Sequence, residues 1–257
     1  MSRILLALLA LQLPLAAAAD TALRFEPPSV FGSTRASVVD ETGKRVGDAH
    51  FETEKLAEGG IRLRGLTRLA SGAGSETEAV LAPAERPDRL KLVSEHSKAF
   101  GAGHTLAVEL RIDHVARRAH CSGSASDGGE LALDADARVA NVPVQLLLRP
   151  LATTGQQRVD AEFVLCRGKP RLISLRGERE GTAAWGKRAR VVEVEYGPTG
   201  FLGVLAGLVA PRASFWFDPS EASPWIAHRM PIEPGGAAVF VVREGVTLPS
   251  ALFESAD

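Results

Sequence analysis

The sequence predicts a mainly β protein, in which an antiparallel sheet curves around one or two short helices. Apolar and polar residues alternate along most of the chain, turn residues interrupt this alternation at short intervals, and helical periodicity is scarce. Alternation with a period of two is typical of antiparallel strands that bury one face and expose the other. Ten or more strands are therefore expected, within a single antiparallel β domain over residues 20–257.

The clearest strand is predicted at residues 105–116, where apolar side chains from Leu106 to Ile112 alternate with charged ones. Its register is well specified, because a slip of one residue would turn the apolar set to solvent. A hairpin is predicted around Gly168, where the motif Gly-Lys-Pro separates two alternating segments. Strands are also predicted at residues 61–70, 158–166, 171–176, 189–196, 213–217, 226–231 and 237–243.

Residues 141–151 break the alternation and predict a buried helix lying across the sheet. Asn141 can cap such a helix, and Pro143 is tolerated in its first turn. The following residues are strongly apolar, and Pro150 is expected to end the helix.

Residues 200–211 are apolar on every side, so in a soluble protein they must be buried, bind something or lie at a membrane surface. A helix that plugs its own core is the plainer interpretation. The tryptophans of the following strands could line a ligand cavity or simply fill the core. The candidate ligand-binding residues are Phe201, Leu202, Leu205, Leu208, Trp216 and Trp225.

Residues 1–19 are predicted to be a cleavable signal peptide. Arg3 precedes an apolar run over residues 4–15, and Ala17 and Ala19 supply a cleavage site. The run is too short to span a bilayer. The mature chain is therefore expected to be periplasmic or secreted, with no integral membrane span.

Cys121 and Cys166 are the only cysteines, and an exported chain meets oxidising conditions, so a disulfide between them is predicted. Closing that loop in the unfolded chain would contribute about 4 kcal/mol in the entropy model. The expected role is structural, because a redox pair would normally have a C-x-x-C spacing.

Charge argues against a nucleic-acid partner. The formal net charge is −1, with acidic and basic side chains interleaved, whereas nucleic-acid binding draws on a basic surface.

Motifs for chemistry are weak. Asp113 and His114 are neighbours on a strand and point to opposite faces, which disfavours a dyad, and His114 is interpreted as a core histidine. His114 and His120 lie too far apart on an extended chain to share a metal ion. Glu193 and Glu195 share a face and could serve glycoside hydrolysis, but a solvated strand face explains them as well. The motifs of serine hydrolases and nucleotide-binding proteins are absent. No catalytic residue, metal site or cofactor is predicted.

Four features in this order resemble a family of exported bacterial β-rich proteins of unknown function. They are the signal peptide, the opening hairpin at residues 43–51, the apolar helix near Asn141, and a late tryptophan-containing strand with Pro224 and residues 229–231. The resemblance implies a strongly curved antiparallel sheet or half-barrel that wraps one or two short helices, similar to the periplasmic lipoprotein carriers. It implies no catalytic residues.

We therefore expect a non-enzymatic periplasmic binding or carrier module for an apolar, lipid-like ligand or a cell-envelope partner. Two alternatives stay open: an envelope-directed hydrolase whose polar groups converge from separate strands, and a structural component that adds an edge strand to an envelope assembly. A large apolar cavity, a cleft that gathers histidines and carboxylates, and an unpaired edge strand would distinguish the three.

Overall fold

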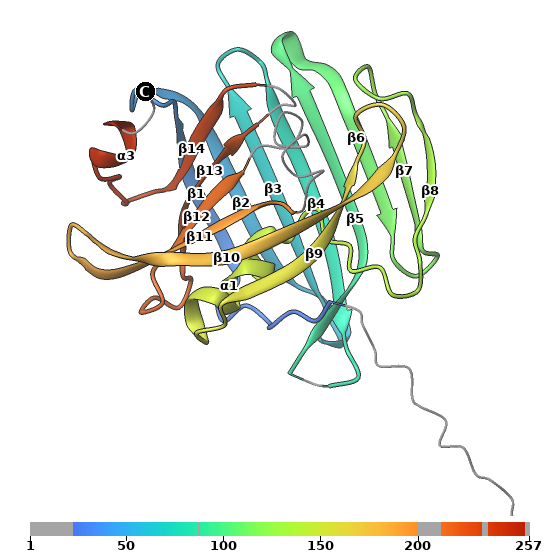
Figure 1. Cartoon of the computed structure of the whole chain (residues 1–257), viewed down its shortest axis with the longest axis horizontal. Coiled ribbons are helices and arrows are strands. Elements are labelled where there is room, and N and C mark those ends of the chain that lie inside the picture. The colour runs from blue at the N-terminus through green and yellow to red at the C-terminus, as the bar shows by residue number, and fades with distance from the viewer. Residues whose placement is uncertain (1–22, 87, 200–211, 233–235, 255–257) are drawn as a thin grey trace, which may run out of the picture.

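The computed structural model describes residues 23–86, 88–199, 212–232 and 236–254, which form one antiparallel sheet rolled into a barrel-like shape (Figure 1). In this part of the chain the sheet has 14 strands, in the order β8-β7-β6-β5-β4-β3-β2-β1-β14-β13-β12-β11-β10-β9. The chain thus builds one half of the sheet outward from β1 to β8, crosses to the other edge, and returns from β9 to β14, which pairs with β1. The predicted mainly β, curved antiparallel architecture is confirmed.

The strands of the first half are β1 (Gly32–Val39), β2 (Arg45–Lys55), β3 (Ile61–Leu69), β4 (Gly74–Pro83), β5 (Leu90–Gly101), β6 (Thr105–Asp113), β7 (Arg118–Ser122) and β8 (Gly129–Ala132). Those of the second half are β9 (Arg158–Leu165), β10 (Arg171–Trp185), β11 (Arg188–Pro198), β12 (Ala213–Phe217), β13 (Trp225–Pro231) and β14 (Ala238–Arg243). The helical elements are η1 (Ala57–Gly59), η2 (Ala102–His104), α1 (Val144–Thr153) and α3 (Ala251–Glu254).

Every strand predicted from alternation is present, and the largest difference in length is at β10. The prediction ended this strand at Arg176, but it continues to Trp185. The added residues are mostly polar, so alternation gave no signal. They form a strand because their backbone pairs with β11 as far as the pair Trp185 and Arg188.

Two details of the predicted helix are wrong. Pro150 lies inside α1 and does not end it. The helix continues for one more turn, and Thr154 donates its backbone N–H and its hydroxyl to the Pro150 carbonyl. Asn141 is not the cap, because Pro143 occupies that position without a side-chain cap hydrogen bond.

The largest hydrophobic core lies on the inner face of the sheet, where α1 packs against the strands of the second half. Leu148 and Leu151 of the helix are completely buried there. Gly177 on β10 permits this contact, since a Cβ atom at that position would lie 2.4 Å from a methyl group of Leu148. The glycine therefore brings the helix close to the sheet.

A second core lies on the outer face of β11 to β14. Trp185, Trp216 and Phe240 form it, and the chain that follows β14 covers it with Leu252 and Phe253. The strands from β11 to β14 are therefore covered on both faces.

The two edges of the sheet overlap at a seam. Ala161 on β9 faces the interior with α1, so Val164, three residues later, faces outward. Val164 and Cys166 nevertheless pack in one cluster with Leu110 and Cys121, which lie on the inner face of β6 and β7. The inner face of one edge thus lies over the outer face of the other. The predicted disulfide between Cys121 and Cys166 is confirmed and crosses this seam, with 5.5 Å between the Cα atoms.

The free edge of β9 is covered by the chain that leads to α1. Ala140 donates its backbone N–H to Glu162, and Glu162 donates to Arg138. The side-chain amide of Asn141 exchanges two hydrogen bonds, both 3.0 Å, with the backbone of Val164. Asn141 therefore substitutes for a strand residue instead of capping the helix.

Candidate functional site

Four aromatic rings meet on the inner face of β2, β12 and β13. The ring of His228 lies 5.3 Å from Phe215 and 5.5 Å from Trp225, centroid to centroid. Phe51 contacts Trp225 edge-on at 5.2 Å. We call Phe51, Phe215, Trp225 and His228 the aromatic wall.

A β-bulge makes this wall possible. The register between β12 and β13 shifts between Trp216 and Phe217, so that Phe217 pairs with Trp225 and Trp216 with Ala227. Trp225 and His228 are three residues apart and would face opposite sides of a regular strand. With the extra residue of the bulge, both face the interior.

Within the described ranges, three buried polar atoms on the inner face of β11 and β13 have no hydrogen-bond partner. They are Nδ1 of His228, Nε1 of Trp225 and the hydroxyl of Tyr196. Each of these residues is 6% exposed. Most buried polar groups in native proteins are paired, and leaving one unpaired costs about 1 to 3 kcal/mol. The interior therefore carries unused hydrogen-bonding capacity beside an aromatic surface.

Burial determines the charge of these groups. It lowers the pKa of His228 to about 3, so the imidazole is neutral at physiological pH. Burial also raises the pKa of the Tyr196 hydroxyl, and the negative charge of Glu95 on β5 adds to that increase. Tyr196 therefore keeps its proton and can donate it in a hydrogen bond.

Small side chains face the interior on the first half of the sheet. Thr67, Ser75 and Ala99 lie in one cross-strand row, and Thr77 and Ser97 lie in the next. All except Thr67 are partly exposed. We call these five residues the small-residue wall, because they fill much less space than the rings of the aromatic wall.

Glu95 is the buried carboxylate of the seam. Its side chain is 1% exposed, and Nε2 of His114 lies 2.8 Å from it. The backbone N–H groups of Asn141 and Val142 also donate to it, at 2.8 and 2.5 Å. The carboxylate therefore positions the chain just before α1. His114 pairs with Glu95 and not with its neighbour Asp113, which caps the β6–β7 turn.

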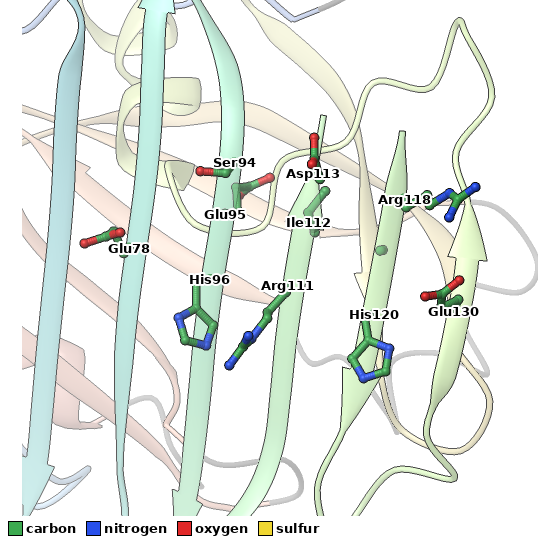
Figure 2. Close-up of a pocket in the computed structure, with 11 residues that line it drawn as sticks. Glu78, Ser94, Glu95, His96, Arg111, Ile112, Asp113, Arg118, His120 and Glu130 are labelled. Atoms are coloured by element: carbon green, nitrogen blue, oxygen red, sulfur yellow. The ribbon is translucent and has the colours of Figure 1, made fainter. Parts of the chain in front are cut away.

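The outer face of the first half is polar. Glu78, His96, Arg111, His120 and Glu130 lie in register across β4 to β8 and border a shallow hollow of about 430 Å³ (Figure 2). A neighbouring hollow of about 450 Å³ shares Glu78 and His96. Cross-strand pairs of opposite charge stabilise an exposed sheet face.

Ion pairs occupy much of this outer surface. Oε1 of Glu109 lies 2.8 Å from both Arg111 and His96. Hydrogen bonds from Arg111 and then His96 lower the pKa of Glu109 to about 2. Within the described ranges, no group of three or more His, Cys, Asp or Glu side chains is arranged to hold a metal ion. This face is a network of paired charges.

The structure separates the two tryptophans predicted as ligand-binding residues. Trp225 belongs to the aromatic wall, whereas Trp216 lies in the outer core, where its ring centroid is 5.5 Å from that of Trp185.

Glu193 and Glu195 share the outer face of β11. Burial raises the pKa of Glu193, and Glu195 forms an ion pair with Arg212. Three predicted features fall outside the described residues: the signal peptide, the apolar segment at residues 200–211, and its members Phe201, Leu202, Leu205 and Leu208.

The sequence does not single out Phe51, Glu95 or Tyr196. It names His228, with His114, as a histidine that the cleft of the alternative hydrolase would gather, and the structure places His228 in the aromatic wall and His114 beside Glu95. Glu95 gave no signal, because its partners lie on other elements. The alternation that predicts strands also does not say which polar residue on a buried face lacks a partner.

Comparison with family models and with curated proteins found no match. One solved structure that resembles this chain is a beta-barrel-like protein of a domain of unknown function, DUF1849, from Brucella abortus. It is 12% identical, the match covers 83% of this chain and 97% of that chain, and the TM-score is 0.47. The β-rich architecture of this chain agrees with the coarser part of the predicted resemblance. The similarity to lipoprotein carriers stays a prediction.

Helix length bears on the membrane prediction. Across the described ranges, no helix has both the length and the apolar character that a bilayer crossing requires.

Proposed function

We propose that this protein is a non-enzymatic, exported binding or carrier module whose rolled sheet holds an apolar, lipid-like ligand against the aromatic wall. One observation carries the proposal: Tyr196, Trp225 and His228 bury polar atoms without partners beside an aromatic surface. A ligand with an apolar body and one polar end would pack against the rings and supply the missing partner. The small-residue wall borders the aromatic wall, because Phe51 pairs with Gly65 in the row of Thr77 and Ser97.

Two further features support this function. The disulfide fits an oxidising compartment outside the cytoplasm. The close pair of Glu95 and His114 holds the chain before α1, so this histidine and this carboxylate are already used for structure. A carrier role requires an enclosed apolar surface and no reactive group.

Tryptophan fluorescence can test the proposal, because the three tryptophans of the sequence report from different places. In a Trp185→Phe, Trp216→Phe variant, only Trp225 on the inner face emits. The matched control is Trp185→Phe, Trp225→Phe, which keeps only Trp216 in the outer core. Circular dichroism establishes that both variants fold. Titration with brominated acyl chains, which quench tryptophan on contact, is expected to quench Trp225 and leave Trp216 unchanged.

Native mass spectrometry of the intact protein from the periplasm complements this experiment. A co-purifying lipid that organic extraction removes would support the module. Equal quenching of both tryptophans would show contact with the outside only. No quenching of Trp225, together with a mass equal to the bare chain, would refute the proposal and leave ordered water as the partner of the three atoms.

A further inference from the structure

We infer that the polar end of the ligand is an uncharged hydrogen-bond acceptor, such as an ester or amide carbonyl, and that a fatty-acid carboxylate or a cationic headgroup is excluded. The inference rests on the proposed function and names the ligand class for the same interior site. It is argued from the groups that have no partner and from the charges around them.

The free groups are suited to an acceptor. The indole N–H of Trp225 can only donate, and the hydroxyl of Tyr196 can donate its proton. Nδ1 of His228 is either donor or acceptor in a neutral ring. A carbonyl oxygen accepts hydrogen bonds, so an ester or amide oxygen can satisfy a donor such as the indole N–H of Trp225.

Among the fully buried residues of the described ranges, none is a cation that could neutralise an anion, and the mostly buried Arg149 and Arg243 already pair with Glu26 and Glu221. The buried polar or charged residues of the described ranges are Thr67, Glu95, Asp218 and His228, so none is a lysine or an arginine. His228 is neutral at physiological pH for the reason given above. A buried carboxylate without a cationic partner is strongly disfavoured.

Glu95 adds a second obstacle to an anion and offers little to a cation. Its negative charge acts on the Tyr196 hydroxyl from the other side of the interior, so it would repel a carboxylate bound there. Its own oxygens already accept from two backbone N–H groups, and His114 contacts one of them. A cationic headgroup would have to displace one of those partners.

A matched set of probes tests the inference in the variant that retains only Trp225. The probes are dibromostearic acid, its methyl ester and a dibrominated alkane of the same chain length, compared at about pH 8, where the carboxyl group is ionised. The ester is expected to bind about tenfold more tightly than the acid and the alkane, which corresponds to about one good hydrogen bond. Tyr196→Phe in the same background should reduce ester affinity by about fivefold and leave alkane affinity unchanged.

The outcomes separate the inference from the proposed function. Acid affinity equal to or above that of the ester would overturn the neutral headgroup and leave the carrier function standing. Alkane affinity equal to that of the ester would overturn the need for an acceptor. Failure of all three probes to quench Trp225 would overturn the proposed function itself.

Discussion

The two halves of the rolled sheet differ in how their faces are packed and in how polar their outer surfaces are. The strands from β11 to β14 are covered on both faces, by α1 and the inner core on one side and by the chain after β14 on the other. In the first half, β4 to β8 present a charged row to solvent (Figure 2), and β3 to β5 present the small-residue wall to the interior. The first of these regions is packed on both faces, and the second meets solvent on one.

This difference bears on the proposed binding site. Phe215, Trp225 and His228 lie on β12 and β13, which are packed on both faces, and their rings contact one another. Phe51 lies on β2 beside Gly65 of β3, so the aromatic wall borders the row of Thr77 and Ser97 in the small-residue wall.

Two phenylalanine substitutions give the largest test of this comparison. Phe217 on β12 is completely buried, whereas Phe51 on β2 is only partly buried. Phe217→Ala should lower the free energy of unfolding by about 4 kcal/mol. Phe51→Ala should lower it by about 2 kcal/mol, because the Phe51 ring is already partly exposed and its removal leaves a smaller buried cavity. Urea unfolding of both variants measures the difference. Equal losses would mean that the interior is packed as tightly at β2 as at β12.

The disulfide joins the two halves, so its removal comes next in size. Cys121→Ser with Cys166→Ser is expected to lower the free energy of unfolding by about 3 to 4 kcal/mol, since the bond restricts the unfolded chain. Val164 and the chain before α1 hold the seam without it. The variant should therefore keep the wild-type circular dichroism spectrum at low temperature.

Single-serine controls distinguish loss of the bond from loss of packing, because the sulfur atoms are buried in the seam cluster. Reduced wild-type protein should match the double variant in urea. If reduction leaves the unfolding midpoint unchanged, the seam is held by side-chain packing alone.

The sequence predicts this fold well because alternation depends only on neighbouring residues. The strand at Thr105–Asp113 and the hairpin around Gly168 follow from local pattern, and the cysteine pair follows from cysteine count and export. Bulges are different, since one extra residue reverses which side chains face inward. In β13 the bulge places Trp225 and His228, three residues apart, on the same face, which alternation alone does not predict.

The contacts at the seam and in the interior also could not be predicted. Glu95 meets His114 and the chain before α1 only after the sheet has rolled up, and the sequence separation to Asn141 is 46 residues. The role of Tyr196 also could not be predicted, because only the folded structure shows that its buried hydroxyl has no hydrogen-bond partner in the described residues.

Acid should act on the two halves in separate pH ranges. The folded pKa of His228 is about 3, below the ordinary value of 6.5, so the unfolded state binds the extra proton. The stability from this group is complete above pH 6.5 and is lost as the pH falls toward 3, with about 2 kcal/mol lost by pH 5. For Glu109, with a folded pKa of about 2 and an ordinary value of 4.5, the loss begins only below pH 4.5.

Unfolding measured from pH 7 to pH 3 in two variants separates these contributions. His228→Leu should flatten the dependence between pH 7 and pH 5, whatever its absolute stability, while Glu109→Gln should flatten only the part below pH 4.5. A wild-type free energy of unfolding that stays constant from pH 7 to pH 5 would contradict the neutral, buried histidine.

The smallest predicted effect is the change in the free energy of unfolding caused by Tyr196→Phe, and its sign is informative. Tyr196→Phe removes a hydroxyl that is buried without a partner and leaves the ring in place. In the ligand-free protein this should raise the free energy of unfolding by about 0.5 to 1 kcal/mol, because an unpaired buried group is relieved and no hydrogen bond is lost. The protein must first be delipidated, and urea unfolding then gives the value. With the methyl ester present, the sign should reverse, because the wild type gains a hydrogen bond that the variant cannot make. Destabilisation in both states would mean that an ordered water already satisfies the hydroxyl, and the small-residue wall would then face a hydrated interior.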